Sequence, residues 1–350
     1  MIRLNCNRIL LLTLALFAWA SLASFTSLTS STSASTAAAP QWWGDGGIVA
    51  EGRFERTLSV SGAVDLEVKT NWGNITVRTG DSSRVQVVGI VKVRRFSTSE
   101  AQSLVKQIEA NPPIKQTGST IVVGFDSTWE DHETRNRVGI SYELVVPAAT
   151  RLRAGTGSGS ATIDGVAGPL DASTGSGSIS LTSIGGEARA HTGSGSITIN
   201  GVKGQLRAST GSGSIRGTGV AGGIIASTGS GEIEVQQVSA GNVEVSTGSG
   251  SIELSGVKGA VRARTGSGSI RAQGEPTGAW SLRSSSGGIV VRLPANQAFE
   301  LDASTSSGSI HTDHPITVMG TIGRRALRGK VRGGGPLLDL NTSSGSIRIE

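Results

Sequence analysis

The chain has 350 residues, of which 51 are glycine and 4% are aromatic. So few aromatic side chains exclude a bulky globular core, whereas a hydrophobic content of 36% is too high for a fully disordered chain. The formal net charge of +6 is mild and dispersed, so it gives no reason to expect a nucleic-acid partner.

The N-terminal segment has the three-part pattern of a secretory signal peptide. Arg3 and Arg8 precede the apolar run 9–23, and small residues follow it. A membrane span needs about 20 apolar residues. The run is shorter, so we expect a cleaved signal and keep a retained anchor as the alternative. Both forms imply export to the periplasm, the outer surface or the medium.

The segment after the signal is almost entirely Ser, Thr and Ala. We expect a spacer here, so that signal and spacer together occupy 1–39. The only cysteine, Cys6, precedes the apolar run. A mature chain without Cys6 would have no disulfide and no thiolate chemistry, and its rigidity must then come from another source.

Residues 40–150 are expected to form N-terminal strands and one capping helix. Apolar and polar side chains alternate over 52–95, as is typical of half-buried strands. The stretch 97–113 differs, because Ser97 or Thr98 can cap a helix and two prolines end it. Its apolar residues lie on one helical face: Ala101, Leu104, Val105 and Ile108. We expect this helix to cover an edge or one side of the strands.

From residue 151 onward one short sequence motif, the phrase TGSGSI with its flanking residues, recurs with a nearly constant period. Residues 208–215 read ASTGSGSI, and nearly the same sequence occurs in every repeat. The phrase opens at Thr156, Thr174, Thr192, Thr210, Thr228, Thr247 and Thr265, with degenerate copies at Thr70, Ser284, Thr305 and Thr342. A period of about 20 residues indicates a solenoid, in which each repeat buries its apolar side chains against its neighbours.

The residues around the phrase indicate which kind of solenoid this is. Apolar residues stand two and four positions before each opening Thr, and a mostly charged column stands between them. From Thr174 onward an isoleucine stands five positions after the opening Thr or Ser, and another apolar residue usually stands seven after it. A second turn is marked by one apolar residue, ten after the Thr: Val166, Ile184, Val202, Val220, Val238 and Val257. Period-2 alternation on both sides of the phrase predicts two short strands per repeat.

We therefore predict an all-β protein, a parallel β-solenoid (β-helix) of two-strand coils about 18 residues long. The regular coils occupy 151–350, and the short helix belongs to the N-terminal side. The glycines of the phrase are expected to turn the backbone, some with a positive φ, and to leave room for stacked turns. The Ser and Thr hydroxyls are expected to cap backbone groups within and between coils.

The charged column is expected to pair along the stack. Its members include Arg153, Asp171, Arg189 and Arg207, and only Ile225 and Ser281 break it. Opposite charges on neighbouring strands would contribute about 0.2–1 kcal/mol per pair.

A C-terminal insert at 312–336 interrupts the repeat, because the step from Thr305 to Thr342 spans about two coils. It contains five basic residues: Arg324, Arg325, Arg328, Lys330 and Arg332. They could form a site for an anionic surface, such as phosphate-bearing lipid or polysaccharide, but we favour a solvated hairpin between two strands. The chain stops at Glu350 directly after a strand, so we expect an open edge and self-association through this end.

These residues resemble a known group. Repeated TGSGSI coils after the strand YELVVPA, with the ending LRGKVRGGGPLLDLNTSSGSIRI, are similar to the bacterial DUF4097 family of candidate adhesins. The resemblance covers about 50–350 and implies an exported β-solenoid with no established enzymatic activity. It supplies no functional residues that could be transferred to this chain.

The residues offer little sign of catalytic or metal chemistry. Two of the four histidines, His311 and His314, form an HTDH motif that weakly resembles a metal cluster, but structural or solvated histidines fit better. His191 occupies a column of serines, and TWEDHE at 128–133, which contains His132, is best explained as an exposed acidic loop. No Lys-Ser/Thr or helix follows the GSGS turns, so they are not phosphate loops. We therefore expect no cofactor, no metal and no catalytic residue.

Three functions fit such a chain. The first is a non-catalytic structural or adhesive protein that binds an envelope polysaccharide, lipid or protein. The second is a polysaccharide-acting β-helix enzyme, which would need clustered carboxylates and long loops that form a cleft. The third is ice binding, which the position of the Thr and Ser residues in a glycine-rich turn disfavours.

Overall fold

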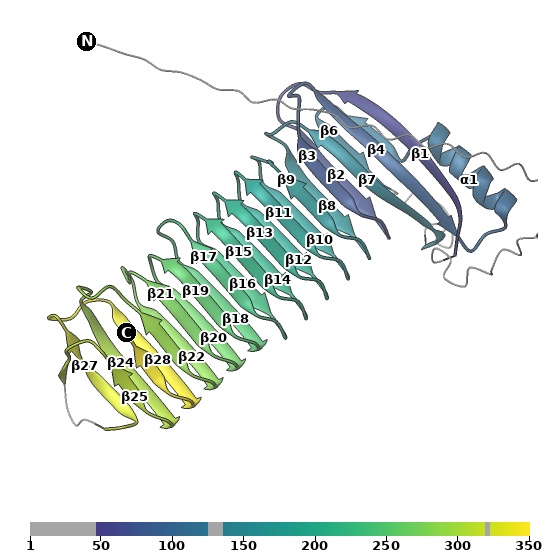
Figure 1. The fold of residues 1–350 in the computed structure, drawn as a ribbon. Helices are drawn as coiled ribbons and strands as arrows, with labels where there is room; N and C mark the ends of the chain where they lie inside the picture. The colour runs from purple at the N-terminus through teal and green to yellow at the C-terminus, as the bar shows by residue number, and fades with distance from the viewer. Residues whose placement is uncertain (1–46, 125–135, 319–322) are drawn as a thin grey trace, which may run out of the picture. The chain divides into compact units, whose positions relative to one another are not determined.

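The structure is a computed structural model that describes residues 47–124, 136–318 and 323–350. The expected signal and spacer at 1–39 and the loop 128–133 lie outside these residues. Asp45–Glu350 form one compact unit, whose strands belong to two sheets. Figure 1 shows the strands stacked along this unit.

The first sheet contains 14 strands. In spatial order they are β1 (Ile48–Ser59), β4 (Arg84–Arg94), β7 (Val138–Val146), β3 (Ile75–Thr79), β9 (Ala161–Asp164), β11 (Ile179–Ile184), β13 (Ile197–Val202), β15 (Ile215–Val220), β17 (Ile233–Gln237), β19 (Ile252–Val257), β21 (Ile270–Gly274), β23 (Ile289–Arg292), β29 (Ile347–Ile349) and β25 (Ile310–Thr312).

The second sheet contains 15 strands. In spatial order they are β26 (Thr317–Val318), β27 (Ala326–Val331), β24 (Phe299–Ser307), β28 (Leu337–Ser344), β22 (Trp280–Ser286), β20 (Val261–Ser267), β18 (Val243–Ser249), β16 (Ile224–Thr228), β14 (Leu206–Thr210), β12 (Ala188–Thr192), β10 (Leu170–Thr174), β8 (Arg151–Thr156), β2 (Asp65–Thr70), β6 (Thr120–Val123) and β5 (Ile114–Thr117).

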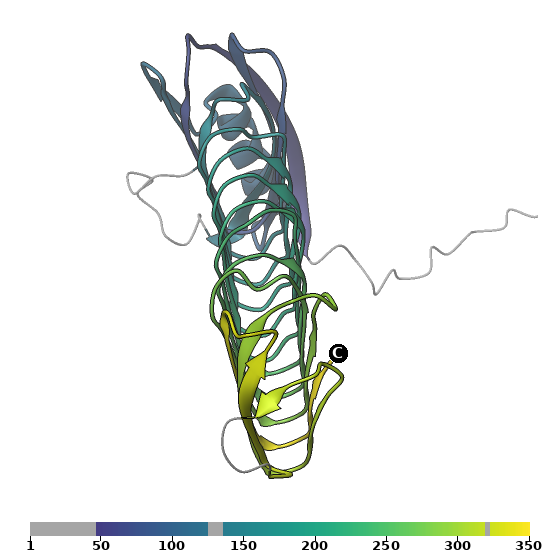
Figure 2. The same ribbon diagram turned by 90° about the vertical axis from the view of Figure 1, so that its left-hand side faces the viewer.

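Each coil contributes one strand to each sheet, and this confirms the predicted parallel β-solenoid. Equivalent residues of successive coils are direct partners in parallel strands; for example, Ile197 pairs with Ile215 and Ala190 with Ala208. The apolar columns before and after the phrase face the space between the sheets, and both isoleucines are 0% exposed. Figure 2 shows the coils one behind another with the sheets on opposite sides. The core is thus a thin aliphatic layer that small residues such as Ala190 keep narrow.

The threonine that opens each phrase forms a continuous hydrogen-bond ladder along the stack. Thr210 is buried, its hydroxyl donates to the carbonyl of Gly195 in the preceding coil at 2.8 Å, and it accepts from the N–H of Gly213 at 3.1 Å. Thr174 and Thr192 make the same pair of contacts. The predicted capping role is therefore confirmed for these threonines, and each ties two coils together.

Replacing Thr210 with valine should lower the free energy of unfolding by about 1–3 kcal/mol, because it leaves a buried carbonyl and a buried N–H without partners. Thr198→Val is the matched control, since Thr198 is exposed on β13 of the same stack. Urea denaturation of both variants measures the difference. Equal stabilities would contradict a structural role for the ladder.

The glycines of the phrase are required for space and not for an unusual backbone conformation. In the copies from Thr156 to Thr265 none of them has a positive φ, so this expectation was wrong. A Cβ atom on Gly213 would lie 1.9 Å from the carbonyl oxygen of Gly195 in the preceding coil. Positive φ values occur instead in the second turn, at Gly201 (81°) and Gly219 (69°). The stacked turns are therefore in direct backbone contact.

The N-terminal end extends both sheets beyond the regular coils. The first coil consists of β2 and β3, which pair with β8 and β9. β7 continues the first sheet parallel to β3, and β4 and β1 follow it as antiparallel strands. In the second sheet, β6 runs parallel to β2 and β5 follows it as an antiparallel strand. The predicted helix is α1 (Thr98–Ala110), with Ser97 as N-cap in a capping box with Glu100. Its buried residues Ala101, Val105 and Ile108 belong to the same core, and α1 packs on β1 and β4.

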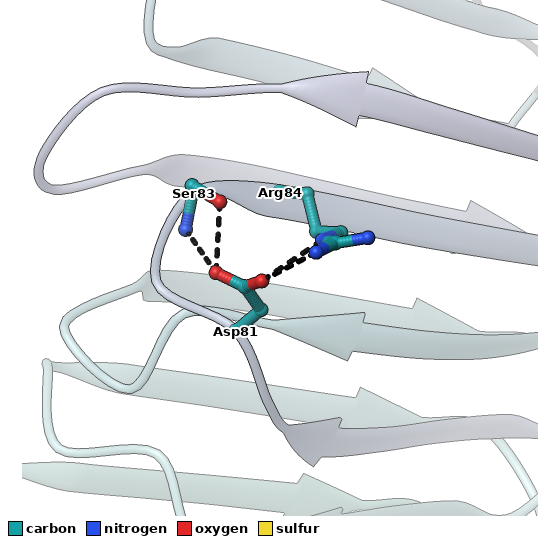
Figure 3. A network of polar contacts seen from close by, with 3 residues as sticks. All are labelled: Asp81, Ser83 and Arg84. Carbon is teal, nitrogen blue, oxygen red and sulfur yellow. Dashed lines mark hydrogen bonds and ion pairs between the residues drawn. The ribbon is translucent and has the colours of Figure 1, made fainter.

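The turn between β3 and β4 is held by a local polar network (Figure 3). The carboxylate of Asp81 accepts from the backbone N–H of Ser83 at 2.9 Å, from the Ser83 hydroxyl at 2.8 Å and from the Arg84 guanidinium at 2.7 Å. These hydrogen bonds, with the Ser83 N–H first, lower the pKa of Asp81 to about 2. The network fixes the turn without any buried group.

An NMR titration should give the Asp81 carboxyl a midpoint near a pKa of about 2. Because the folded pKa lies below the unfolded pKa of about 3.9, the stabilisation is present above about pH 4 and is lost as the pH falls toward 2. Asp81→Asn should remove this acid dependence of stability. A midpoint near 3.9 would show that the network does not persist in solution.

One coil departs from the predicted columns, because the step from Thr228 to Thr247 is one position longer than those before it. Val238 follows β17 in the second turn, as predicted, but it is 58% exposed and does not take the buried place that Val220 and Val257 occupy in other coils. Gln237 takes the place instead: it pairs with Val220, is 2% exposed, and its amide donates to the carbonyls of Gly222 and Gly241. A buried amide with backbone partners therefore replaces the valine.

The order of the last coils differs from their order in the sequence. The final strands, β28 and β29, lie between β22–β23 and β24–β25. The threonine ladder follows the same order, because Thr342 donates to Gly287 and Thr305 donates to Gly345. The expectation that the last strand leaves an open edge was therefore wrong. The strands at this end are β25 in the first sheet and β26 in the second.

Candidate functional site

The predicted charged column lies on the outer face of the second sheet. Each coil adds one strand, or rung, to this sheet and one residue to the column. Successive members are direct partners: Arg189 with Arg207, Ile225 with Glu244, and Arg262 with Ser281. Because their neighbours on either side along the strand point into the core, these side chains point to solvent. The column thus presents a ladder of side chains about 4.8 Å apart.

The ion pairs of this face do not run along the column as predicted. Within the described residues, Arg189 and Arg207 both contact Glu187, at 2.8 and 3.6 Å, and Asp171 pairs with neither Arg153 nor Arg189. Glu187 belongs to the adjacent column, at the start of the strands. The predicted pairing along one column was therefore wrong, and Arg189 and Arg207 pair instead with a carboxylate of the neighbouring column.

A hollow of about 550 Å³ lies on this face, over β14, β16, β18, β20 and β22. The outward column next to the charged one reads Glu187, Gln205, Gly223, Asn242, Ala260 and Ala279 along the stack, and the small side chains of Gly223, Ala260 and Ala279 leave space for the hollow. The outward lining residues are Gln205, Gly223, Ile225, Asn242, Glu244, Ala260, Arg262, Ala279 and Ser281. This volume lies in the range of small-ligand sites.

The lining combines one aliphatic surface with groups of both charges. Ile225 is half-buried, while Glu244 and Arg262 are exposed on neighbouring strands. Across the described chain neither of these two charges makes an ion pair. The exposed amide of Asn242 lies beside them. The hollow can therefore donate and accept several hydrogen bonds along one direction, and it offers an apolar contact at Ile225.

A second hollow, of about 360 Å³, lies beside the turns that follow β19 and β21. Its charged groups are already paired: Lys258 contacts Glu275 at 3.6 Å, and Arg292, which lines the hollow, contacts Glu350 at 2.9 Å. Hydrogen bonding to Glu350 raises the pKa of Arg292. We therefore regard the first hollow as the better candidate site.

The three histidines in the described residues do not converge on one centre. His191 is exposed and its Nδ1 lies 2.8 Å from the Ser209 hydroxyl, in the column of serines. His311 contacts Asp313 at 2.9 Å, whereas His314 is buried with its ring edge-on to Phe299. His132 lies outside the described residues. In the three described ranges, no three His, Cys, Asp or Glu residues are placed to hold a metal ion.

The basic insert forms a strand pair at the end of the second sheet. Antiparallel β27 pairs with β24, and β26 pairs with β27. Arg328 and Lys330 face acidic partners on β24: Arg328 contacts Asp302 at 3.0 Å and Lys330 contacts Glu300 at 2.9 Å. Two of the five cations are therefore neutralised across the sheet, which weakens the interpretation of the insert as an anion site.

Sequence reasoning did not locate the hollow, although a signal for it was present. The two residues that break the charged column, Ile225 and Ser281, stand at its two ends. The hollow also depends on Gly223, Ala260 and Ala279 in the adjacent column, and these residues align only when the register between coils is known.

The fold places the chain among parallel β-solenoid proteins. Residues 190–350 match the family model described as Toastrack DUF4097, so the family resemblance is confirmed for this part of the chain. No curated protein sequence matches the chain.

Two solved structures are similar to the chain at low sequence identity. A candidate cell adhesion protein from Clostridium sporogenes covers 86% of this chain and 99% of its own, with 9% identity and a TM-score of 0.20. A candidate adhesin from Bacteroides fragilis covers 85% of this chain and 97% of its own, with 11% identity and a TM-score of 0.31.

Proposed function

We propose that the protein is a non-catalytic, exported binding protein and that the hollow over β14–β22 binds an envelope or surface polysaccharide. The observation that carries this proposal is the combination of the 550 Å³ hollow with unpaired Glu244 and Arg262 in its lining. A linear sugar chain presents hydroxyl groups along its length, and the hollow presents amide, carboxylate and guanidinium groups rung by rung. Export is supported by the signal-like pattern of 1–39.

The carboxylate content of the hollow favours binding over cleavage. Glycoside hydrolysis uses a pair of carboxyl groups about 5–9.5 Å apart on either side of the scissile bond. Among the lining residues, Glu244 is the only carboxylate. The polysaccharide-acting enzyme is therefore the second candidate. Neither polysaccharide binding nor polysaccharide cleavage needs a membrane anchor. Within the described segments, no helix has the length and hydropathy of a membrane span.

A glycan array probed with the full-length protein should show retained glycans and no released products. The double variant E244Q/R262A should lose at least about tenfold in affinity, because two or more charge-assisted hydrogen bonds are removed. Ile225→Arg should also abolish binding, since the longer side chain fills the hollow.

The matched control is R153A/D171A, which removes two opposite charges from the same face at residues that do not line this hollow. This variant should bind like the unmodified protein. Equal losses in both double variants would show that the hollow is not the site, and released sugars would favour the enzyme.

A further inference from the structure

We propose that the C-terminal coil, β28 and β29, is an exchangeable element that a second copy of this chain can accept, which gives a strand-exchanged dimer. The proposal is independent of the sugar site. It depends on the insertion of this coil between two coils that precede it in the sequence.

The slot for the C-terminal coil is formed by strands on both sides. β28 is in register with β22 on one side and with β24 on the other, and β29 is in register with β23 and β25. Leu338, Leu340 and Ile349 are 0% exposed in it. A chain whose last coil is absent from this slot therefore has unpaired strands and an open apolar core on two faces.

The last residue holds the coil in place at its far end. The carbonyl of Glu350 accepts from the N–H of Leu293 at 2.9 Å, and its carboxylate contacts the Arg292 guanidinium at 2.9 Å. Leu293 begins the connection that carries the chain past the slot to β24. The contacts that fill the slot are made by residues 337–350 alone, so the same segment of a second chain can make all of them.

The hinge before the coil is short and conformationally strained. It runs from the end of β27 to the start of β28 and crosses to the opposite side of β24, because β27 and β28 pair with the two edges of that strand. Three consecutive hinge residues have positive φ: Arg332 (53°), Gly333 (87°) and Gly334 (96°). A side chain such as that of Arg332 rarely adopts this conformation. Opening the hinge relieves the backbone strain at Arg332. Strained short hinges favour exchange between copies.

The partner is a second copy, because the slot accepts a coil of this repeat and the C-terminal coil fits it in register on both sides. It requires two strands that both continue the aliphatic columns, with Thr342 positioned to donate to Gly287 and Gly345 positioned to accept from Thr305. A segment with the spacing of Leu338, Thr342 and Ile347 satisfies these contacts together. The C-terminal coil of another copy has this spacing and can take the same register with β22 and β24.

Disulfide trapping between single-cysteine variants tests the exchange directly. Arg283 and Asn341 are exposed partners across β22 and β28. R283C and N341C, each combined with C6S, are mixed at tens of micromolar, incubated and oxidised, and the linked species are identified by mass spectrometry. We expect a dimer that joins the two different variants. The matched control mixes R264C with R283C, which are also register partners but lie in coils that follow each other directly.

A cross-link that is no more abundant than in the control would overturn the proposal.

A second pair of variants changes only the hinge. Deleting Gly333 and Gly334 should raise the dimer fraction by at least about tenfold in size-exclusion chromatography with light scattering, because the coil then cannot reach its own slot. Adding two glycines after Gly335 should favour the monomer, and identical monomer fractions in both variants would contradict exchange.

Discussion

The Gly213→Ala variant is expected to lose about 3 kcal/mol of unfolding free energy, which is the upper end of the usual cost of overpacking. The added Cβ atom would lie 1.9 Å from the carbonyl oxygen of Gly195 and 2.4 Å from its carbonyl carbon. These are backbone atoms of the preceding coil, so no side chain can rotate away. Relief requires the two coils to separate, which also weakens the Thr210 hydrogen bonds.

Gly217→Ala is the control, because it adds the same methyl group to the same coil. Its Cβ atom would meet side-chain atoms of Val220 and Val235 at 3.7 Å, an ordinary contact. This variant should be as stable as the unmodified protein or gain about 0.5–1 kcal/mol from the removal of a strand glycine. Urea denaturation compares the two, and similar stabilities would contradict the close stacking of the turns.

Replacing Trp280 with alanine should cost about 3–5 kcal/mol, the usual cost of removing a large aromatic side chain from a core. Trp280 is 0% exposed and stands in a column otherwise occupied by small or aliphatic residues such as Leu206 and Val261. Its indole N–H donates to the carbonyl of Gly259 at 2.9 Å. The substitution therefore creates a cavity and also leaves a backbone acceptor without its partner.

Trp280→Phe separates these two effects. A phenyl ring keeps most of the packing and loses the hydrogen bond, so about 1–3 kcal/mol is expected. Thermal or urea unfolding of the two variants measures both values. If Trp280→Ala cost less than Trp280→Phe, the tryptophan would not be filling a tightly packed core.

Most of the fold could be predicted because the repeat fixes the register. Ile197 and Ile215 occupy equivalent positions in successive repeats, and such residues become direct partners once coils stack. The helix 98–110 was predictable for a local reason, since Ser97 and Glu100 form its capping box. Both predictions depend only on spacing within one or two coils.

The order of the last coils could not be predicted for the same reason. Every coil presents nearly the same columns, so the coil of Thr342 can stack on that of Ser284 as well as the coil of Thr305 can. The exposure of Val238 was missed because the longer step from Thr228 to Thr247 allows either Gln237 or Val238 to enter the turn. Gln237 takes the buried place because its amide donates hydrogen bonds there. One acceptor, the carbonyl of Gly222, belongs to the preceding coil.

The candidate site was only partly predictable. Ile225 and Ser281 were visible as breaks in the charged column, but the hollow between them depends on Gly223, Ala260 and Ala279 in the adjacent column. The ion pairs of Arg189 and Arg207 were assigned to the wrong partner because Glu187, although near in sequence, belongs to another column. These contacts depend on how far a side chain extends toward the neighbouring column. The alternation of residues along one strand does not predict this.

The solenoid rests on the in-register stacking of its coils and on the spatial order of the last three coils. Distances between pairs of spin labels test both at once, with one label at Ser173 and the second at Arg283, Asn341 or Ser304, all attached through cysteine substitutions. Ser173 and Arg283 occupy one outward column six rungs apart. At a rung spacing of about 4.8 Å, the account predicts about 29 Å to Arg283, about 34 Å to Asn341 and about 38 Å to Ser304 in the monomer fraction. A longer distance to Asn341 than to Ser304 would contradict it.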